Sequence, residues 1–147
     1  MPARPLSGLT AASGFARLRH RAQPFWLDSG SAADGLGRYS FVGCDPAQIL
    51  ARTVGAGDPL ADLERAVKGA AYDPGVPGPC PVAVGYLGYE LRRECERVPA
   101  RLPDDLGLPD LWFGWYPAVA RFDHETGEAL VLGASDAAAG ALTSALR

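Results

Sequence analysis

The sequence predicts an α+β fold in which antiparallel β-sheets pack with a few helices. Short runs of β-branched and aromatic residues recur between turn signals, as they do in strands, and residues 122–128 are typical of a hairpin turn between the last two runs. Helical periodicity is limited to short stretches such as residues 58–69. With 147 residues, 48% of them hydrophobic, the chain is long enough to bury one core.

Composition and charge disfavour several classes of function. The net charge of −3 disfavours general electrostatic binding of nucleic acid, which needs a basic face. No run approaches the roughly 18 apolar residues of a membrane span, and residues 1–13 lack the pattern of a secretory signal. Cys44, Cys80 and Cys95 form no Cys-x-x-Cys pair, so neither a disulfide framework nor a zinc site is indicated. We therefore expect a cytoplasmic protein with free thiols that binds neither nucleic acid nor membrane.

The first part of the chain alternates strand and turn signals. Prolines and glycines interrupt residues 1–24, which we expect to be a loosely ordered segment. Residues 25–27 give a short strand signal, and residues 38–43 alternate as a half-buried strand does. Residues 48–54 give a further strand. The short link between these last two strands predicts that they pair antiparallel.

A helix and a loop follow these strands. Asp58 is a favourable N-cap and Pro59 a favourable first residue, and the helix is expected to end near Gly69. Its apolar positions on one face are Leu60, Leu63, Ala66 and Val67. Residues 73–81 are rich in proline and glycine, which predicts an irregular surface loop.

The last part of the chain carries the strongest strand signal. A helical turn is expected from Tyr89 to about Glu96, followed by an irregular connection. Three strands are expected at residues 111–116, 118–123 and 129–132. A final alanine-rich helix is expected at residues 135–147, where Ser135 is the N-cap.

Residues 81–90, Pro-Val-Ala-Val-Gly-Tyr-Leu-Gly-Tyr-Glu, combine a buried strand signal with two glycines. Gly85 and Gly88 enclose Tyr86 and Leu87, so the backbone can turn sharply or approach another surface closely. One interpretation is that this corner seats a ligand or a neighbouring domain, and the other is a core strand that ends in a bend. The residues alone favour the packing interpretation.

The polar cluster after residues 25–27 is the second candidate for function. Asp28 and Ser29 could satisfy the local backbone as turn residues, or could receive the ammonium group of an amino-acid ligand. The residues alone favour the turn. His124 lies in the predicted hairpin turn without a positioned acid or nucleophile beside it, which favours a solvated or locally bonded histidine over a catalytic one.

Four segments in this order resemble the N-terminal domain of component I of the chorismate-utilising enzymes, the group that contains anthranilate synthase and aminodeoxychorismate synthase. They are residues 25–29, 37–43 and 84–91, and the region from Leu108-Pro109-Asp110-Leu111 to residues 122–124. The resemblance implies an α+β domain at residues 25–134 and a helix at 135–147 that stops before the catalytic domain. Phe-Trp-Leu-Asp-Ser and Tyr-Leu-Gly-Tyr-Glu-Leu-x-x-Glu-Cys are more similar to aminodeoxychorismate synthase, on the branch to 4-aminobenzoate and folate.

The resemblance also implies partners and site residues. The complete enzyme would aminate chorismate with ammonia from a glutamine amidotransferase, using a magnesium ion held in a larger chorismate-binding domain. Asp28 and Ser29, with Arg38, would contribute to a tryptophan pocket at the domain junction, although Asp28 is one methylene shorter than the family's usual Glu. The residues expected at the domain interface are Gly85, Tyr86, Gly88 and Tyr89. A domain of this kind should expose an apolar face, expected here from Tyr86, Trp112, Phe113 and Trp115, and should tend to self-associate.

The family's catalytic and magnesium-binding groups belong to the chorismate-binding domain, so this chain is assigned no catalytic residue, no metal ligand and no cofactor. We expect it to be the N-terminal domain of an aminodeoxychorismate synthase component I that is inactive alone. Two alternatives are open. One is the same domain from anthranilate synthase component I, and the other is a stand-alone, non-enzymatic module that binds an aromatic amino acid or a separate chorismate-binding chain.

Overall fold

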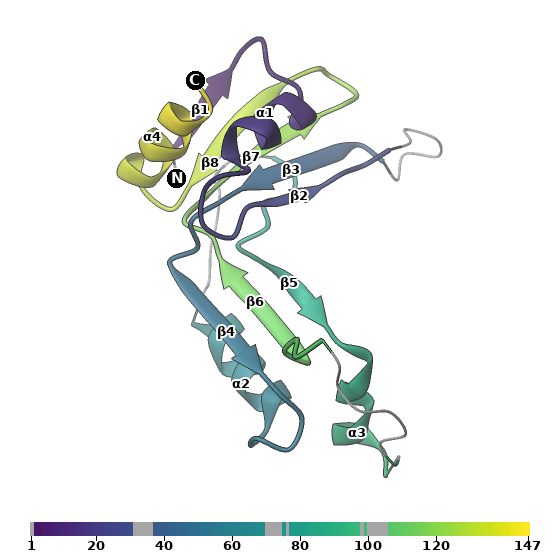
Figure 1. The fold of residues 1–147 in the computed structure, drawn as a ribbon. Helices are drawn as coiled ribbons and strands as arrows, with labels where there is room; N and C mark the ends of the chain where they lie inside the picture. Colours follow the sequence, from purple (N-terminus) through teal and green to yellow (C-terminus); the bar gives the residue numbers. More distant parts are fainter. Residues whose placement is uncertain (1, 31–36, 70–74, 76, 98, 100–105) are drawn as a thin grey trace. The chain divides into compact units, whose positions relative to one another are not determined.

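The computed structural model describes residues 2–30, 37–69, 75, 77–97, 99 and 106–147. These residues form eight β-strands in two antiparallel sheets, together with short helices, which confirms the predicted α+β class (Figure 1). The chain divides into two compact units whose segments alternate along the sequence. The five-stranded unit comprises residues 1–47, 72–82 and 116–147, and the three-stranded unit comprises residues 48–71 and 83–115.

The sheet of the five-stranded unit has the strand order β1-β8-β7-β3-β2. Its strands are β1 (Ala3–Leu6), β2 (Phe25–Leu27), β3 (Tyr39–Gly43), β7 (Ala118–Asp123) and β8 (Ala129–Gly133). Every neighbouring pair is antiparallel. The predicted hairpin joins β7 to β8, and the strands predicted at residues 25–27 and 38–43 are β2 and β3.

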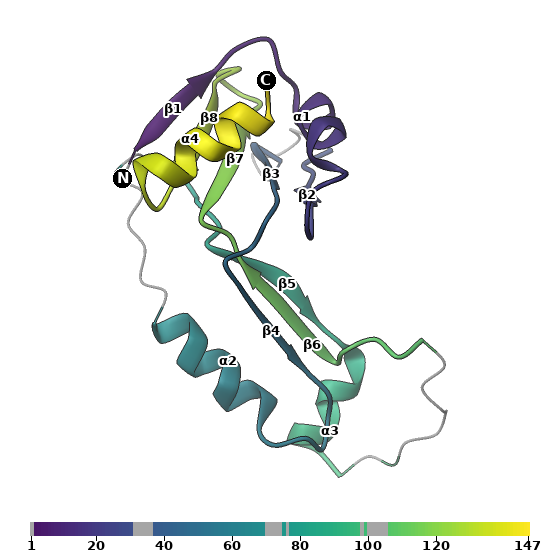
Figure 2. The same ribbon diagram turned by 60° about the vertical axis from the view of Figure 1, so that its left-hand side comes forward.

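Helices α1 (Ala11–Leu18) and α4 (Asp136–Ala145) contribute to one core on the same face of this sheet (Figure 2). The core residues without exposure are Leu18, Val42, Ala120, Val131, Ala139 and Leu146. Ser135 caps α4 as predicted, because its hydroxyl oxygen accepts the N–H of Ala138 at 3.1 Å. Burial of this apolar surface is the main force that holds the helices on the sheet.

The N-terminal segment contains regular structure where the sequence predicted loose order. β1 pairs with β8, with Pro5 opposite Leu130. Thr10 and Ser13 form a capping box at the start of α1, in which Thr10 Oγ1 accepts from the N–H of Ser13 at 3.2 Å and Ser13 Oγ accepts from the N–H of Thr10 at 2.9 Å. The partner of β1 lies near the other end of the chain, so no local pattern could reveal it. The family domain expected at residues 25–134 stays a prediction.

The sheet of the three-stranded unit has the strand order β4-β6-β5. Its strands are β4 (Gln48–Arg52), β5 (Ala83–Leu87) and β6 (Leu111–Trp115). β4 pairs with β6, so the predicted pairing of residues 48–54 with residues 38–43 is wrong. In the short link, Asp45 takes a left-handed conformation with φ 56° and accepts hydrogen bonds from Arg21 and Ala22.

Helix α2 (Pro59–Lys68) begins and ends where the sequence predicts. Asp58 accepts the N–H of Ala61 at 2.9 Å, and Gly69 is the C-cap. Leu63 and Ala66 pack against the sheet, but Leu60 and Val67 are exposed, so the predicted apolar face is only partly buried. After β5 come the 3-10 turn η2 (Tyr89–Leu91) and α3 (Arg92–Cys95), which match the predicted helical turn.

Arg121 anchors part of the proline-rich segment to β7. Its Nη1 donates to the carbonyl oxygens of Pro77 at 2.7 Å and Pro79 at 3.4 Å, and its guanidinium lies 5.3 Å from the centre of the Tyr39 ring. Gly78, between the two prolines, has φ 98°. A Cβ there would lie 2.6 Å from Arg121 Nη1, so both the backbone conformation and the close approach require glycine.

Candidate functional site

Ser40, fully buried on β3, is the centre of a polar cluster in the five-stranded unit. Its hydroxyl oxygen lies 3.1 Å from Asp28 Oδ1 and accepts the N–H of Ser29 at 3.0 Å. His124 Nε2 lies 2.7 Å from the same oxygen. The structure therefore joins Asp28 and Ser29 to Ser40, which the sequence did not single out, and to His124, which the sequence placed in the hairpin turn as a solvated or locally bonded histidine.

Ser29 serves the local backbone and still has acceptor capacity. Its hydroxyl donates to the carbonyl oxygen of Tyr39 at 2.6 Å, which is the turn role that the residues alone favoured. The oxygen of a donating hydroxyl can still accept a hydrogen bond. Asp28 is exposed, and its Oδ2 makes no hydrogen bond to any other described residue. Together the carboxylate and the hydroxyl offer acceptors to a ligand ammonium group.

Arg38 is engaged elsewhere, with two acidic residues. It forms a two-pronged ion pair with Asp123, in which Nε and Nη2 lie 3.1 Å and 2.7 Å from Oδ2, and Nη1 lies 2.7 Å from Glu125. The hydrogen bonds from Arg38 hold the pKa of Asp123 well below its usual range, helped by the N–H groups of Glu125 and Thr126. No described hydrogen bond or ion pair joins Arg38 to the Asp28–Ser29 turn. Its role in a tryptophan pocket, like that of the turn, stays a prediction.

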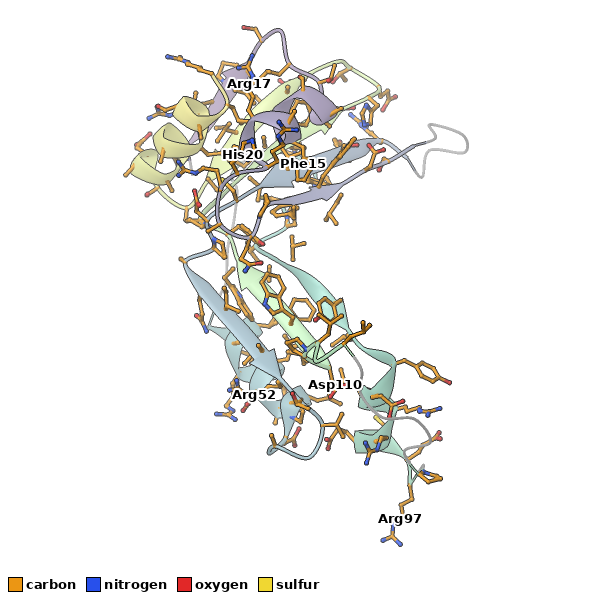
Figure 3. All side chains as sticks on the ribbon, in the orientation of Figure 1. Phe15, Arg17, His20, Arg52, Arg97 and Asp110 are labelled. Atoms are coloured by element: carbon orange, nitrogen blue, oxygen red, sulfur yellow. The ribbon has the colours of Figure 1, made fainter. Side chains whose placement is uncertain are left out.

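Asp110, from the motif region at residues 108–111, connects three parts of the three-stranded unit. Figure 3 labels this residue, which directly precedes β6. Its Oδ2 accepts the N–H of Val54 at 2.8 Å, just after β4, and its carbonyl oxygen accepts the N–H of Gly88 at 2.6 Å, just after β5. This residue therefore fixes the ends of both outer strands to the central strand.

Close packing of β5 on β6 accounts for the two glycines of the Gly85–Gly88 corner. A Cβ on Gly85 would lie 2.0 Å from the carbonyl oxygen of Trp112, and one on Gly88 would lie 2.8 Å from that of Asp110. Both obstacles are backbone atoms that cannot rotate away. The tyrosines of the corner point to solvent, since Tyr86 is 41% and Tyr89 is 78% exposed. The packing interpretation thus explains the glycines, and the interface role of the corner stays a prediction.

One face of the three-stranded sheet carries apolar side chains against which no described helix or strand of its own unit packs. Strand register places Ile49, Ala51, Val84, Tyr86 and Trp112 on this face, which we call the bare sheet face. The opposite face holds Leu50, Leu111 and Trp115 in the core with α2. Of the four aromatic residues expected on an exposed apolar face, Tyr86 and Trp112 are there. Phe113 and Trp115 alternate to the core side, and Trp115 is buried.

The described residues offer little for metal or thiol chemistry. They contain no group of three or more His, Cys, Asp or Glu side chains that could hold a metal ion. Burial raises the pKa of the Cys44 thiol to about 11, which keeps it protonated and poorly nucleophilic. No described helix is long and apolar enough to cross a bilayer.

Curated proteins similar to this chain are named anthranilate synthase component 1. The "probable" protein of that name from Schizosaccharomyces pombe is 35% identical over 124 residues, which cover 82% of this chain and 25% of that protein. The Streptomyces coelicolor protein is 35% identical over 109 residues, covering 74% and 21%. The Thermus thermophilus protein is 47% identical over 68 residues, covering 46% and 15%. The chain thus spans a quarter or less of the length of these relatives. No protein-family model matches the chain.

These similarities support the relationship to the chorismate-utilising enzymes that the four motif segments indicate. They do not support the aminodeoxychorismate synthase branch, which the residues of two motifs favoured. The relatives from fungi and bacteria carry the name anthranilate synthase component 1, and so does one from the archaeon Haloarcula marismortui, 35% identical over 104 residues. The alternative interpretation of the sequence, anthranilate synthase component I, therefore fits these findings better.

Proposed function

We propose that this chain is the N-terminal domain of an anthranilate synthase component I. The observation that carries the proposal is the similarity to proteins of that name, at 35% identity over 82% of the chain in the Schizosaccharomyces pombe case. The ordered motif segments at residues 25–29, 37–43 and 84–91 support the coarser relationship to the chorismate-utilising enzymes, and two of them are more similar to aminodeoxychorismate synthase. In the complete enzyme, chorismate would be aminated with ammonia from a glutamine amidotransferase and would give anthranilate, with the ring hydroxyl leaving as water and the enolpyruvyl group as pyruvate.

In this proposal the chain supplies structure and regulation, and the chemistry belongs to a chorismate-binding polypeptide. Catalysis on chorismate needs groups that bind two carboxylates, a general acid or base, and acidic ligands for magnesium. The described residues contain no acidic cluster that could hold a metal ion. Among the described residues, the cluster most similar to a catalytic triad is that of Asp28, Ser40 and His124. Its serine is fully buried, and its acid is hydrogen-bonded to the serine and not to the histidine, which is not the arrangement of a triad.

The bare sheet face is the proposed docking surface for the chorismate-binding polypeptide. Ile49 is 47% and Tyr86 is 41% exposed there; Trp112 lies on the central strand opposite Tyr86, and Val84 lies two residues before Tyr86 on β5. An apolar sheet face is stable in water only when another layer covers it. The relatives have three quarters or more of their length outside the matched stretch, which is ample polypeptide for such a layer.

The Asp28–Ser29 turn is the proposed contribution of this chain to a tryptophan site. The exposed carboxylate of Asp28 and the acceptor oxygen of Ser29 suit the ammonium group of an amino acid. Ser40 would hold both residues in place from the buried side.

Aminodeoxychorismate synthase component I is the second candidate, because Phe-Trp-Leu-Asp-Ser at residues 25–29 favours it. Tryptophan that inhibits an enzyme built with this domain would favour the anthranilate branch.

Co-purification tests the proposed docking. The tagged chain is co-expressed with the Streptomyces coelicolor relative from which the matched stretch has been removed, and the control pair is that relative's own stretch with the same remainder. We expect the remainder to co-purify with both. Ile49→Lys should abolish capture. Val67→Lys should leave capture intact, because Val67 is also an exposed apolar position, at 54% against 47% for Ile49, but lies on α2. Capture by the relative's own stretch but not by this chain would contradict the proposal.

A further inference from the structure

Strand β5 is an open edge of the three-stranded sheet. The strand order β4-β6-β5 leaves one side of β5 without a partner among the described strands. The N–H of Tyr116 donates to the carbonyl of Val82 at 3.0 Å, and that of Gly88 donates to the carbonyl of Asp110 at 2.6 Å. In an antiparallel pair, the backbone groups of alternate residues face the partner strand. These two hydrogen bonds show that the residues of β5 that face β6 are the even-numbered ones. The backbone N–H and C=O groups of Ala83, Gly85 and Leu87 therefore point to the open side.

This edge lacks the devices by which proteins protect their strand edges. Natural edges are blunted by charged residues, prolines, bulges or very short strands. β5 reads Ala-Val-Gly-Tyr-Leu, pairs with β6 in regular register over its whole length, and exposes Gly85, Tyr86 and Leu87. An exposed, uncharged edge of this kind is a template for another strand.

The other edge strands of the described sheets are protected. β1 contains Arg4 and Pro5, and β2 is three residues long. β4 ends in Arg52, which forms an ion pair with Asp62 at 2.5 Å. Among the described strands, β5 is therefore the favourable place for the addition of another strand.

We propose that β5 pairs antiparallel with β5 of a second copy of this chain, which joins the two three-stranded sheets across a twofold axis at Gly85. In this register the outward groups of Gly85 face those of the partner's Gly85, and Ala83 pairs with the partner's Leu87. Val84 lies opposite the partner's Tyr86 on the bare sheet face, so apolar side chains meet and no like charges oppose one another. The absence of a Cβ at the axis lets the two backbones approach closely.

The pairing is isologous and closes at two copies, because each molecule contributes the same edge, that of β5, and β5 is then paired on both sides. A five-residue strand buries less surface than the roughly 1,200 Å² of a standard stable interface, so we expect a weak dimer that forms at high micromolar concentration and dissociates on dilution. The inference does not rest on the proposed function. It concerns the edge of β5, whereas the chorismate-binding polypeptide is proposed to cover the bare sheet face.

Sedimentation equilibrium over a range of concentrations tests this pairing. We expect the average mass to rise from that of the monomer toward twice that value and no further. Leu87→Pro removes an outward N–H without touching the bonds to β6, and places its ring where the partner strand would lie. The dissociation constant should rise by about tenfold or more.

A charge-matched pair of variants gives the control. Leu87→Lys should weaken the dimer to a similar degree as Leu87→Pro, and Val67→Lys should leave it unchanged, since the two side chains are 56% and 54% exposed. Far-ultraviolet circular dichroism shows that each variant is folded. A chain that stays monomeric at high micromolar concentration would overturn the proposal. So would a dimer that survives both Leu87 variants, or one that Ile49→Lys alone removes.

Discussion

Adding a single methyl group at Gly85 should severely destabilise the three-stranded unit. In Gly85→Ala the new Cβ would lie 2.0 Å from the carbonyl oxygen of Trp112 and 2.7 Å from the Cα of Phe113. Overpacking of a core typically costs about 1 to 3 kcal/mol. The obstacles here are backbone atoms of the paired strand β6, which no rotamer change can relieve, so we expect a loss of about 3 kcal/mol in the free energy of unfolding.

Urea and thermal unfolding, followed by circular dichroism and tryptophan fluorescence, measure this loss. A change of this size lowers the melting temperature by roughly 6 to 12 °C in a chain of this length. Gly30→Ala is the matched control, because nothing lies within 4 Å of the new Cβ and the backbone there is not left-handed. Its effect should stay within about 0.5 kcal/mol.

The two interpretations of the glycine corner predict different outcomes for this pair. If Gly85 served only the approach of a ligand or a neighbouring domain, Gly85→Ala would be as stable as Gly30→Ala and would lose only an interaction. Equal stability of the two variants would therefore refute the packing interpretation.

Three further predictions concern the five-stranded unit and the thiols. Arg121→Met should cost about 2 to 3 kcal/mol in urea unfolding, because two carbonyls of the proline-rich segment lose a charged donor. The lowered pKa of Asp123 stabilises the fold above its unfolded value of about 3.9, and this contribution is lost as the pH falls below that value. Acid unfolding of Asp123→Asn should thus depend less on pH below about pH 4 than that of the unaltered chain, and an unchanged profile would exclude the ion pair with Arg38. Iodoacetamide should modify exposed Cys95 at least about tenfold faster than buried Cys44, whose pKa is raised, and equal rates would contradict that burial.

Local signals in the sequence predicted the elements that depend on neighbours in the chain. Asp58 and Pro59 mark the start of α2 because a cap and a first-turn proline act within one turn. Ser135 marks α4 for the same reason. The hairpin between β7 and β8 follows from a turn-forming segment between two apolar runs.

Pairings between distant parts of the chain could not be predicted in this way. The strand character of β4 was evident, but its partner β6 lies on the far side of α2 and β5 in the sequence. β1 was missed altogether, because its pairing with β8 supplies the order that its own residues do not. Secondary structure that depends on a distant partner leaves no local pattern.

The candidate site likewise has a part that local sequence signals predict and a part that depends on residues distant in the chain. Asp28 and Ser29 are adjacent in the sequence, so their turn could be recognised from them alone. Ser40 and His124 join them through a hydrogen bond of 2.7 Å between residues 84 positions apart. Register accounts for this contact, because Ser40 lies opposite Phe122, two residues before the histidine. A small hydroxyl residue between the bulky Tyr39 and Phe41 was the one available signal.

Anthranilate formation by a chimera tests the assignment of this domain most directly. In the Streptomyces coelicolor relative, the matched stretch of 109 residues is replaced by the corresponding part of this chain. We predict that the purified chimera, in the presence of magnesium, forms anthranilate from chorismate and ammonia at a rate within about tenfold of the parent enzyme, a difference of about 1.4 kcal/mol in activation free energy. A chimera that is folded by circular dichroism and forms no anthranilate, while the parent is active in the same assay, would contradict the proposed function.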